Sequence, residues 1–581
     1  MQRHAPRHLG DLSDPSKAAP IDVAARWLNN SALLQRSLVH MASANTLFAL
    51  VQRLLGGMAL DIAIVGASVA QAGGCVRQPA KRCIEYNGRR KVANPVPPYN
   101  GSVRIKGFMV RLLEVINTTW PAEHRLFNGG ADATPVSLIA ECLFSHIPRN
   151  PNLVILEFGS MAGTIGDSFN AVEAIVRTLL DVPTPPALVF LTVREWAHRS
   201  NLRTLTLYGP SERTAWTVAE ERFEQLCRHY EQSCISYHAA LSPLLTASPP
   251  QLELLDVASD GLHPSTGRLG VAFLTAMVTH WLRTAVAVVS DSNGWNSARL
   301  TSSKAPTHSP LPPPLWAVDA HLTAAGSSRC YGFGRILGRG RFAVYQRAAP
   351  IPWRTASCSE AHTPLEQCAE VDRERACPRR VPATHPAHGQ PPTPPLPPPP
   401  RVFVYCYEAF NKHGLPGKRS PGALALTPNA TIELPVDTRL STRPDGATTT
   451  AHGASSLSSS SLLSAIDQSS HVTARVTLAY LTSYAGGMGR AHVSCARGCA
   501  CDSTTLDSFR VSRTRNVSVF ARHVLEIRGH ASAMCIVRVR VLPESSTDGH
   551  KFKLGSLLTV SVTRGGYHGG YSAVRSLGSY E

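Results

Sequence analysis

The chain has 581 residues, 43% of them hydrophobic, and carries 58 Lys and Arg against 40 Asp and Glu, a formal charge of +18. Its length predicts roughly two to four domains, and no run of about 18 apolar residues occurs, which excludes a membrane-spanning helix. Only nine of the basic residues are lysines. Because the arginines are scattered singly instead of forming a stripe with aromatic residues, the charge does not indicate a nucleic-acid partner.

The cysteines and the glycosylation motifs favour an oxidising compartment. The chain contains 14 cysteines, and N-x-[ST] sequons occur at Asn29, Asn100, Asn117, Asn429 and Asn516. Since disulfides persist mainly outside the cytosol, we expect a protein of the secretory pathway, the Golgi or the extracellular space. Residues 1–10 lack the apolar core of a signal peptide, which is the observation against this location.

The first half of the chain alternates short apolar runs with amphipathic stretches. Residues 1–20 are polar and predict a disordered N-terminus. Between Ile21 and Leu55 apolar residues recur at helical spacing, and Gly56-Gly57 predicts the end of that helix. Strands are predicted at Leu60–Val65, His124–Phe127, Leu153–Phe158 and Ala187–Val193, and helices at Pro135–His146, Ser168–Leu180, Ser211–Tyr230 and Thr266–Val289. This alternation is typical of a parallel sheet covered on both faces, so we expect an α/β domain over residues 21–290.

Several segments of the second half predict irregular chain. The whole sequence contains 42 Gly and 44 Pro, which indicates that parts of the chain are irregular. The Ser/Pro-rich region at 291–400 predicts a linker with a short ordered part near 315–350. Residues 441–470 are rich in Ser and Thr and predict a disordered insertion. Residues 567–581 form a tail.

The remainder of the second half has the pattern of antiparallel strands. Within residues 401–566, runs such as Arg475–Tyr480 and Cys535–Val541 alternate apolar with polar or charged residues. A period of two predicts strands with one buried face. We therefore expect a β-rich, sandwich-like C-terminal domain that contains the insertion.

Two loops of the α/β domain carry residues suited to nucleophilic catalysis. Ser68 follows the strand Leu60–Val65 after Gly66 and Ala67, which places its hydroxyl at a sharp turn. Asp260 and His263 lie three residues apart, just before the last helix. His263 can take the proton of Ser68 as a general base, while Asp260 orients the imidazole and stabilises its charged form. In an open α/β sheet these residues would meet beyond the carboxyl ends of the strands.

These motifs resemble those of the SGNH hydrolases, also called GDSL esterases. Gly66-Ala67-Ser68 is similar to the first block of that family, where many members have Gly-Asp-Ser, and Asp260 to His263 is similar to its last block, Asp-x-x-His. The stretch from Asn128-Gly129-Gly130 to Thr134 looks like the second block. The resemblance covers roughly residues 30–288 and implies a three-layer, flavodoxin-like parallel sheet. It also implies that the backbone N–H groups of Ser68 and Ala133 bind the oxyanion, without a cofactor or a metal.

One position departs from the family pattern. After the strand Leu153–Phe158, the third block of SGNH hydrolases has an Asn whose side chain donates to the oxyanion, and by spacing this chain has Met161 there. A thioether cannot donate a hydrogen bond, and the loss of one oxyanion donor lowers turnover about 10²- to 10³-fold. The resemblance therefore implies weak or altered activity. Ser160 could supply a hydroxyl only if its side chain pointed the other way.

Two functions from different classes are consistent with these features. The first is a serine esterase that acts on O-acyl groups, chiefly acetyl esters of a polysaccharide or glycan, with water or a sugar hydroxyl as the acceptor. Hydrolysis and acyl transfer both stay open at this point. The second is a non-catalytic, glycan-binding or cell-surface structural protein that retains the fold, which Met161 favours. Neither function involves a nucleic acid or a membrane-spanning segment.

Cysteines and aromatics outside these motifs have two interpretations each. Cys495, Cys499, Cys501 and Cys535 fit disulfides better than a zinc site, because zinc sites usually have two clusters of paired ligands and this region has one. The pairs Cys75 and Cys83, and Cys227 and Cys234, fit either small disulfides or free thiols. Tyr480 and Tyr484 fit either packing in the core or stacking on a sugar.

Overall fold

The computed structural model describes residues 27–71, 81–87, 90–93, 103–131, 134–161, 168–199, 205–208, 212, 214–258, 261–265, 269–292, 310–316, 329–332, 349–350, 403–410, 416–439, 472–484, 486–511, 518–528, 532 and 534–562. The predicted disordered N-terminus, the insertion at 441–470, the tail and most of the linker at 291–400 lie outside these residues. The domain boundaries therefore stay predictions.

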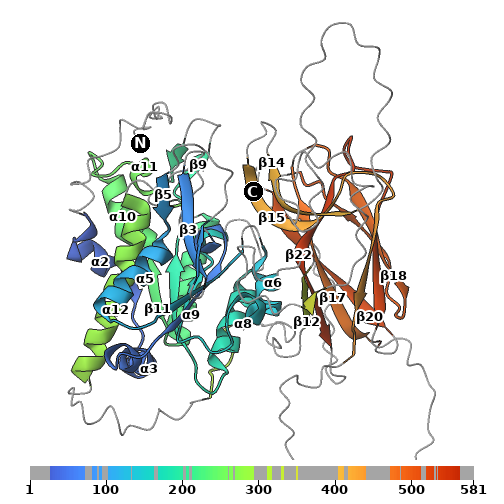
Figure 1. Ribbon diagram of the computed structural model, residues 1–581. Helices are drawn as coiled ribbons and strands as arrows, with labels where there is room; N and C mark the ends of the chain where they lie inside the picture. Colours follow the sequence, from blue (N-terminus) through green and yellow to red (C-terminus); the bar gives the residue numbers. More distant parts are fainter. Residues whose placement is uncertain are drawn as a thin grey trace, which may run out of the picture.

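The first part of the chain forms a six-stranded sheet with the strand order β1-β11-β8-β7-β2-β6 (Figure 1). Its strands are β1 (Leu38–His40), β2 (Asp61–Gly66), β6 (Arg125–Gly130), β7 (Leu153–Glu157), β8 (Ala187–Thr192) and β11 (Ser233–Ser236). Only β1 is antiparallel to its neighbour in this sheet. Counted from β2, the parallel strands have the order 2-1-3-4-5 of flavodoxin-like folds, in which the chain reverses direction across the sheet between β2 and β7.

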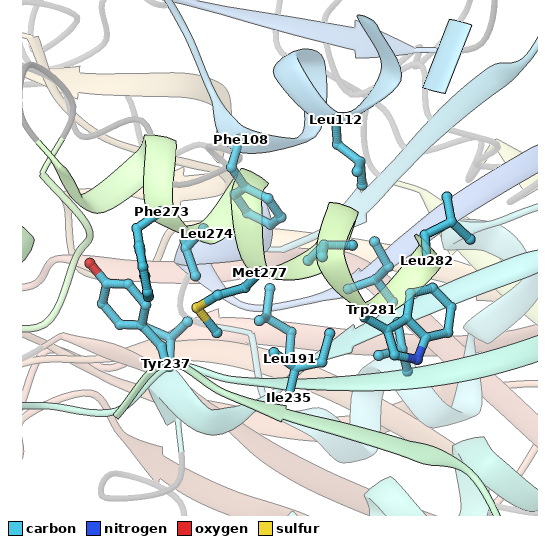
Figure 2. Packing of buried hydrophobic residues seen from close by; sticks show 14 of the residues in the cluster. Phe108, Leu112, Leu191, Ile235, Tyr237, Phe273, Leu274, Met277, Trp281 and Leu282 are labelled. Atoms are coloured by element: carbon cyan, nitrogen blue, oxygen red, sulfur yellow. The ribbon is translucent and has the colours of Figure 1, made fainter. Parts of the chain in front are cut away.

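Helices cover both faces of this sheet (Figure 1). One face is covered by α2 (Ser31–Ser37), α3 (Ala44–Leu55), α5 (Phe108–Thr119), α10 (Tyr237–Thr246) and α12 (Leu269–Ser292), and the other by α6 (Val136–Glu141), α8 (Ser168–Leu180) and α9 (Ala215–His229). Short helices occur as α4 (Ser68–Gln71), α7 (Leu143–His146), η2 (Gly159–Met161) and α11 (Leu254–Val257). Figure 2 shows Met277 of α12 lying between Phe108 of α5 and Ile235 of the sheet. The parallel sheet and its two helical layers confirm the α/β class predicted from the sequence.

Two predicted helices are wrong in detail. The helical pattern that ends at Leu55 is interrupted by β1, whose Leu38 lies opposite Ile235 of β11. Apolar spacing cannot reveal this strand, because its backbone groups are paired by a strand almost 200 residues away. The predicted helix Pro135–His146 is divided at Cys142 into α6 and α7.

The sequence also missed short strands around the main sheet. They are β3 (Lys81–Asn87), β4 (Arg90–Ala93) and β5 (Val103–Lys106) in one small sheet, and β9 (Ala197–Arg199) and β10 (Leu205–Leu207) in another. The four predicted core strands all occur. β6 extends through Asn128-Gly129-Gly130, which the sequence placed after the strand.

The helix α12 is apolar because it lies in the core. Among the described residues it is the one helix long and apolar enough to cross a membrane by length and composition, with a mean hydropathy of 1.4 over Leu269–Asp291. However, 56% of that window is buried within the protein, and α12 contacts α3 and α5. Packing in the helical layer therefore accounts for its composition.

The second part of the chain consists of two packed β-sheets. The larger contains β12 (Arg329–Gly332), β13 (Ala349–Pro350), β14 (Val404–Phe410), β15 (Pro416–Ala425), β17 (Val472–Thr482), β20 (Val519–Arg528) and β22 (Phe552–Val562), and the smaller contains β16 (Thr431–Val436), β18 (Arg490–Arg497), β19 (Thr504–Asp507) and β21 (Cys535–Val541). Val476 and Leu558 of the larger sheet share one buried cluster with Val493 and Val537 of the smaller. The sheets thus face each other across a common core, which confirms the β-rich prediction.

Disulfides brace both parts of the chain. The four cysteines predicted to form disulfides in the second part are all bonded, Cys495 to Cys501 and Cys499 to Cys535, a connectivity that the sequence left open. Cys227 is bonded to Cys234, which decides between the two interpretations of that pair. The sulfur atoms of Cys495, Cys499 and Cys535 lie within 4.8 Å of one another, but each belongs to a disulfide, and a metal would need the thiolate. Cys75 lies outside the described residues, so a disulfide and free thiols both stay open for Cys75 and Cys83.

The helix α6 joins the two parts of the chain through a disulfide and an apolar contact. Cys142, the residue after α6, is bonded to Cys330 of β12, a pairing across 188 residues that the sequence did not suggest. Leu138 of α6 packs with Ala479 and Phe520 of the larger sheet of the sandwich. Residues on either side of Ala479 face the sandwich core, so α6 contacts the outer face of that sheet.

An ion pair lies beside this disulfide. Glu141, the last residue of α6, is 3% exposed. Its carboxylate accepts hydrogen bonds from Arg522 of β20 and from the Thr559 hydroxyl of β22. Covalent, ionic and apolar contacts therefore attach one short helix of the first part to the sandwich.

Part of the predicted linker is packed against the first part of the chain. The backbone N–H groups of Leu315 and Trp316 donate to the carboxylate of Glu173 in α8 (2.6 and 2.9 Å). Arg177 of the same helix donates to the Pro312 carbonyl (2.6 Å). In addition, β12 and β13, from the ordered part predicted near 315–350, belong to the larger sheet of the sandwich.

Candidate active site

Ser68 lies in a tight turn at the carboxyl end of β2, which we call the Ser68 turn (residues 66–71). A Cβ atom on Gly66 would lie 2.0 Å from the carbonyl oxygen of Glu157 and 2.9 Å from Cβ of Ala70. Glycine is therefore required where β2 passes into α4. The Ala67 N–H donates to the same Glu157 oxygen (3.2 Å), which continues the pairing of β2 with β7 up to the residue before Ser68.

His263 lies in a loop that is held at both ends, the His263 loop (residues 261–265). The Gly261 carbonyl accepts a hydrogen bond from the Trp196 N–H (2.8 Å), and Gly261 itself has φ +86°, a conformation that favours glycine. The Ser265 N–H donates to the Val257 carbonyl (3.0 Å). These contacts fix the loop between the end of β8 and the start of α12.

The Ser68 turn and the His263 loop meet although they are far apart in the sequence. The Oγ atom of Ser68 lies 2.8 Å from Nε2 of His263, across 195 residues. Both residues are half-buried. A serine and a histidine at this distance can act as nucleophile and base when the imidazole carries its proton on Nδ1. The pair lies where β2 and β7 adjoin, the switch point at which ligands bind in this strand order.

Two other predicted site residues lie outside the described part of the chain. They are Asp260 and Ala133, and their roles as orienting carboxylate and oxyanion donor stay predictions. Asn128, from the second predicted block, accepts a hydrogen bond from the Gly130 N–H on its own Oδ1 (3.0 Å). The Ala131 N–H donates to the Gly66 carbonyl (2.9 Å), so this block begins beside the Ser68 turn.

Met161 and Ser160 occupy the turn after β7. Met161 is 5% exposed and belongs to the apolar cluster under α6 and α8. Its thioether has no proton to donate to an oxyanion. The Ser160 hydroxyl donates to Oε2 of Glu157 (3.1 Å), so it points at this carboxylate.

Glu157 is the residue of this region that the sequence did not single out. It ends β7 and is completely buried. Burial raises the pKa of Glu157 to about 7, although hydrogen bonds from Ser160 and Ala70 and the charge of His263 act in the opposite direction. The sequence does contain a sign of it, because Glu157 is the one charged residue in the otherwise apolar run Leu153–Phe158.

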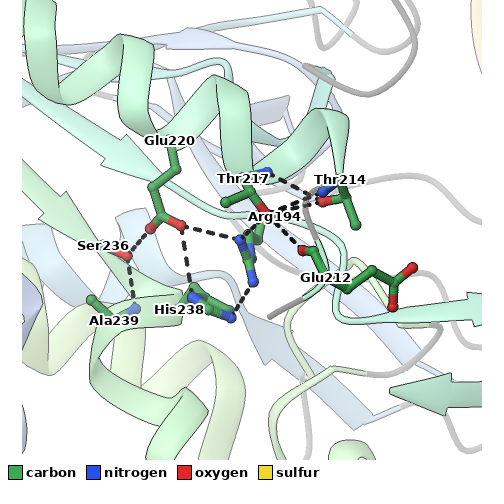
Figure 3. Close-up of polar contacts among 8 residues, drawn as sticks. All are labelled: Arg194, Glu212, Thr214, Thr217, Glu220, Ser236, His238 and Ala239. Carbon is green, nitrogen blue, oxygen red and sulfur yellow. Dashed lines mark hydrogen bonds and ion pairs between the residues drawn. The ribbon is translucent and has the colours of Figure 1, made fainter. Parts of the chain in front are cut away.

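A second, partly buried polar cluster of Arg194, Glu220 and His238 lies near the ends of β8 and β11 (Figure 3). Arg194 donates to Nε2 of His238, and its guanidinium lies 3.5 Å from the carboxylate of Glu220. Burial and then the charge of Arg194 lower the pKa of His238 to about 3, so its ring is neutral and accepts from the arginine. Trp196, which holds the Gly261 carbonyl, packs its ring against His238 (centroids 5.0 Å apart).

The two tyrosines that could stack on a sugar differ in burial. The ring of Tyr480 is stacked on Phe552, with centroids 5.8 Å apart and planes 6° apart, and packs against the sandwich core. Tyr484 is 42% exposed. The core interpretation therefore fits Tyr480, and Tyr484 is the more exposed of the two.

Comparison with known proteins gives distant structural likenesses. No protein-family model and no curated protein matches the chain. The chain is similar to a two-domain esterase (CEX) active on acetylated mannans, solved with and without mannopentaose, at 13% and 14% identity and a TM-score of 0.46, over 91% of this chain and 98% and 99% of that chain. It is also similar to the CBM36-1 domain of a multidomain xylanase from the hindgut metagenome of Trinervitermes trinervoides, at 8% identity and a TM-score of 0.14, over 28% of this chain and 91% of that chain. These TM-scores are too low to establish a shared fold or function.

Proposed function

We propose that the chain is a serine esterase of the SGNH type that acts on O-acyl, chiefly acetyl, esters of a polysaccharide or glycan. The observation that carries this proposal is the 2.8 Å contact between Ser68 Oγ and His263 Nε2. Its location at the switch point of a parallel sheet supports the proposal, since ligands of such sheets bind there. The spacing of Asp260 and His263 in the sequence supports it as well.

In the proposed mechanism, Ser68 Oγ attacks the acyl carbonyl while His263 takes its proton. Asp260 orients the imidazole and stabilises its positive charge. The N–H groups of Ser68 and Ala133 bind the oxyanion of the tetrahedral intermediate. His263 then returns the proton to the departing sugar oxygen, and a water or a sugar hydroxyl releases the acyl group from Ser68 by the same steps in reverse order.

The glycan and the compartment are proposed on separate grounds. The family resemblance and the attached β-rich part support a glycan ester as the substrate. Disulfides in both parts of the chain support the secretory pathway or the extracellular space. The sequon residues Asn29 and Asn429 are exposed, as glycosylation would require. We also propose that residues 21–290 and 401–566 form the two main domains.

Hydrolysis of p-nitrophenyl acetate tests the catalytic proposal. We expect the purified chain to turn over this ester, and Ser68→Ala and His263→Ala to lower the rate about 10³-fold or more, because each removes a member of the reacting pair. Ser242→Ala in α10 is the matched control and should keep the full rate. Equal rates for the wild type and Ser68→Ala would remove Ser68 from the mechanism.

A second function is favoured by Met161. A buried thioether where an oxyanion donor is expected fits a non-catalytic, glycan-binding protein that retains the fold. Met161→Asn separates the two functions. If the site is an esterase, the new donor should raise kcat by about tenfold or more. Absence of turnover in both the wild type and Met161→Asn, with glycan-array binding that survives Ser68→Ala, would support the second function.

A further inference from the structure

Glu157 contacts the backbone on both sides of Ser68. It lies opposite Gly66 in the pairing of β2 with β7. Its carbonyl oxygen accepts from the Ala67 N–H (3.2 Å), and Oε2 of its side chain accepts from the Ala70 N–H (3.2 Å). One residue therefore holds the residue before Ser68 and the second residue after it.

The same carboxylate holds the turn η2. Its Oε1 accepts from the Ser160 N–H and its Oε2 from the Ser160 hydroxyl, both at 3.1 Å. The partners shown for this carboxylate are thus two N–H groups, which can only donate, and one O–H group, which can donate or accept. A deprotonated carboxylate can accept from all of them, whereas a protonated one has a hydrogen of its own to donate. The arrangement fits the charged form of Glu157.

The pKa of Glu157 is set by influences that act in opposite directions. Burial raises its pKa, and the hydrogen bonds of Ser160 and Ala70 lower it. Among the described residues, His263 is the titratable group that acts on this carboxylate, and in its protonated form it also lowers the pKa of Glu157. The resulting pKa of about 7 means that Glu157 changes its charge near neutral pH.

We propose that Glu157 is a positioning residue for Ser68, whose charged carboxylate fixes the first turn of α4 and the turn η2 in one arrangement. The inference rests on the proposed function in that it takes Ser68 as the nucleophile. Glu157 acts through the backbone of Ala67 and Ala70 and not on the reacting atoms. When the carboxylate is protonated it accepts these hydrogen bonds less strongly, because hydrogen bonds to charged groups are the stronger ones.

The rate at which a fluorophosphonate probe labels Ser68, measured from about pH 5.5 to 8.5, tests this role. We expect the wild type to react about tenfold faster than Glu157→Gln at the upper end, as the loss of a hydrogen bond to a charged group implies. The ratio should fall towards one at the lower end, where Glu157 of the wild type is protonated and residue 157 is therefore uncharged in both proteins. Ser160→Ala removes a single donor, so its effect should have the same direction and be about threefold.

Glu173→Gln is the matched control. Glu173 is also fully buried, and its carboxylate accepts from the Tyr230 hydroxyl and from the Leu315 and Trp316 N–H groups, on α8 away from Ser68. This variant replaces a buried carboxylate that has similar partners and should keep the pH profile of the wild type. A ratio between wild type and Glu157→Gln that does not change with pH would overturn the positioning role.

Hydrogen exchange of the peptide that spans residues 66–71 gives a readout that does not depend on activity. We expect this peptide to exchange about tenfold faster in Glu157→Gln than in the wild type at about pH 8.5, and unchanged in Glu173→Gln. If the protection of residues 66–71 is unchanged in Glu157→Gln, the role of Glu157 is overturned. If Glu157→Gln does not fold, unchanged protection in Ser160→Ala decides in the same way. If the wild type is not labelled at Ser68, the esterase proposal fails, while the exchange measurement still decides the positioning role.

Discussion

The two parts of the molecule differ in the side chains that fill their cores, although the sandwich also buries one lysine, Lys553, outside its apolar cluster. In the parallel-sheet part, Glu157, Glu173 and Arg194 are all buried, and each has partners from other segments of the chain. In the sandwich, the shared core is apolar, and the charged residues of β21 lie on its exposed face. A buried charge requires donors or acceptors at defined positions, whereas an apolar core requires only volume and shape. The contrast explains why the specific polar site lies in the first part, whose core provides such donors and acceptors.

Gly66→Ala should have the largest effect on the first part. The new Cβ would lie 2.0 Å from the carbonyl oxygen of Glu157, so β2 and β7 would have to separate. We expect a loss of more than about 3 kcal/mol in the free energy of unfolding, measured with urea, together with loss of Ser68 labelling. Gly486→Ala, where no atom lies within 4 Å of the added Cβ, should change neither. A stable and reactive Gly66→Ala protein would contradict the close approach of the two strands.

Leu558→Ala tests whether the sandwich can be weakened by itself. Leu558 is fully buried between the two sheets, and its truncation should cost about 2–5 kcal/mol in unfolding free energy. At temperatures below unfolding, we expect the labelling rate of Ser68 to stay at the wild-type value. A parallel loss of labelling would show that the two parts unfold as one unit.

The charge of Glu157 should make the stability of the first part depend on pH. Its pKa in the folded protein is about 7, above the ordinary 4.5, so the folded protein binds this proton more tightly than the unfolded chain. The resulting stabilisation is complete below about pH 4.5 and is lost as the pH rises to about 7, by roughly 3 kcal/mol in total.

Glu157→Gln should lack this component of the pH dependence. Urea unfolding of both proteins at about pH 4.5 and 7.5 measures it. The wild type should lose more unfolding free energy over this interval than the variant. An equal loss in both proteins would show that Glu157 does not titrate there.

Arg522→Ala should have the smallest of these effects and tests the attachment of the sandwich through α6. It leaves the buried Glu141 with Thr559 as its remaining partner from the sandwich. Because Arg522 is itself 28% exposed, we expect a loss of about 1–2 kcal/mol. Arg475→Ala breaks a more exposed ion pair with Glu526 on the same sheet and should cost less than about 1 kcal/mol. Equal losses of unfolding free energy for Arg522→Ala and Arg475→Ala, measured by thermal unfolding, would show that the ion pair with α6 stabilises the protein no more than a surface ion pair does.

Much of the parallel sheet and of the sandwich could be predicted because their patterns are local. The apolar runs of β2, β7 and β8 are long enough to be recognised without their partners. The alternation in β21 shows which face is buried. Ser68 and His263 could be predicted as a pair because each directly adjoins a predicted element whose place in the sheet follows from the fold class.

Other features could not be predicted because they depend on segments that are distant in the sequence. The strand β1 exists through its pairing with β11, and the Cys142–Cys330 disulfide through the contact of α6 with the sandwich. The burial of Glu157 could not be predicted for the same reason, since the N–H groups that donate to its carboxylate come from the Ser68 turn and from η2. A charged residue in an apolar strand is only a sign that such donors exist.

The sequence by itself determined the class of each part, four strands of the parallel sheet (β2, β6, β7 and β8), and the residues Ser68 and His263 as a candidate pair. Local periodicity is enough for these, because a strand or helix shows its buried face in its own residues. The tertiary structure decided the 2.8 Å contact of that pair, the carboxylate beneath it, and the attachment of the sandwich through α6. Each of these depends on where distant segments meet, and only the packed chain brings them together.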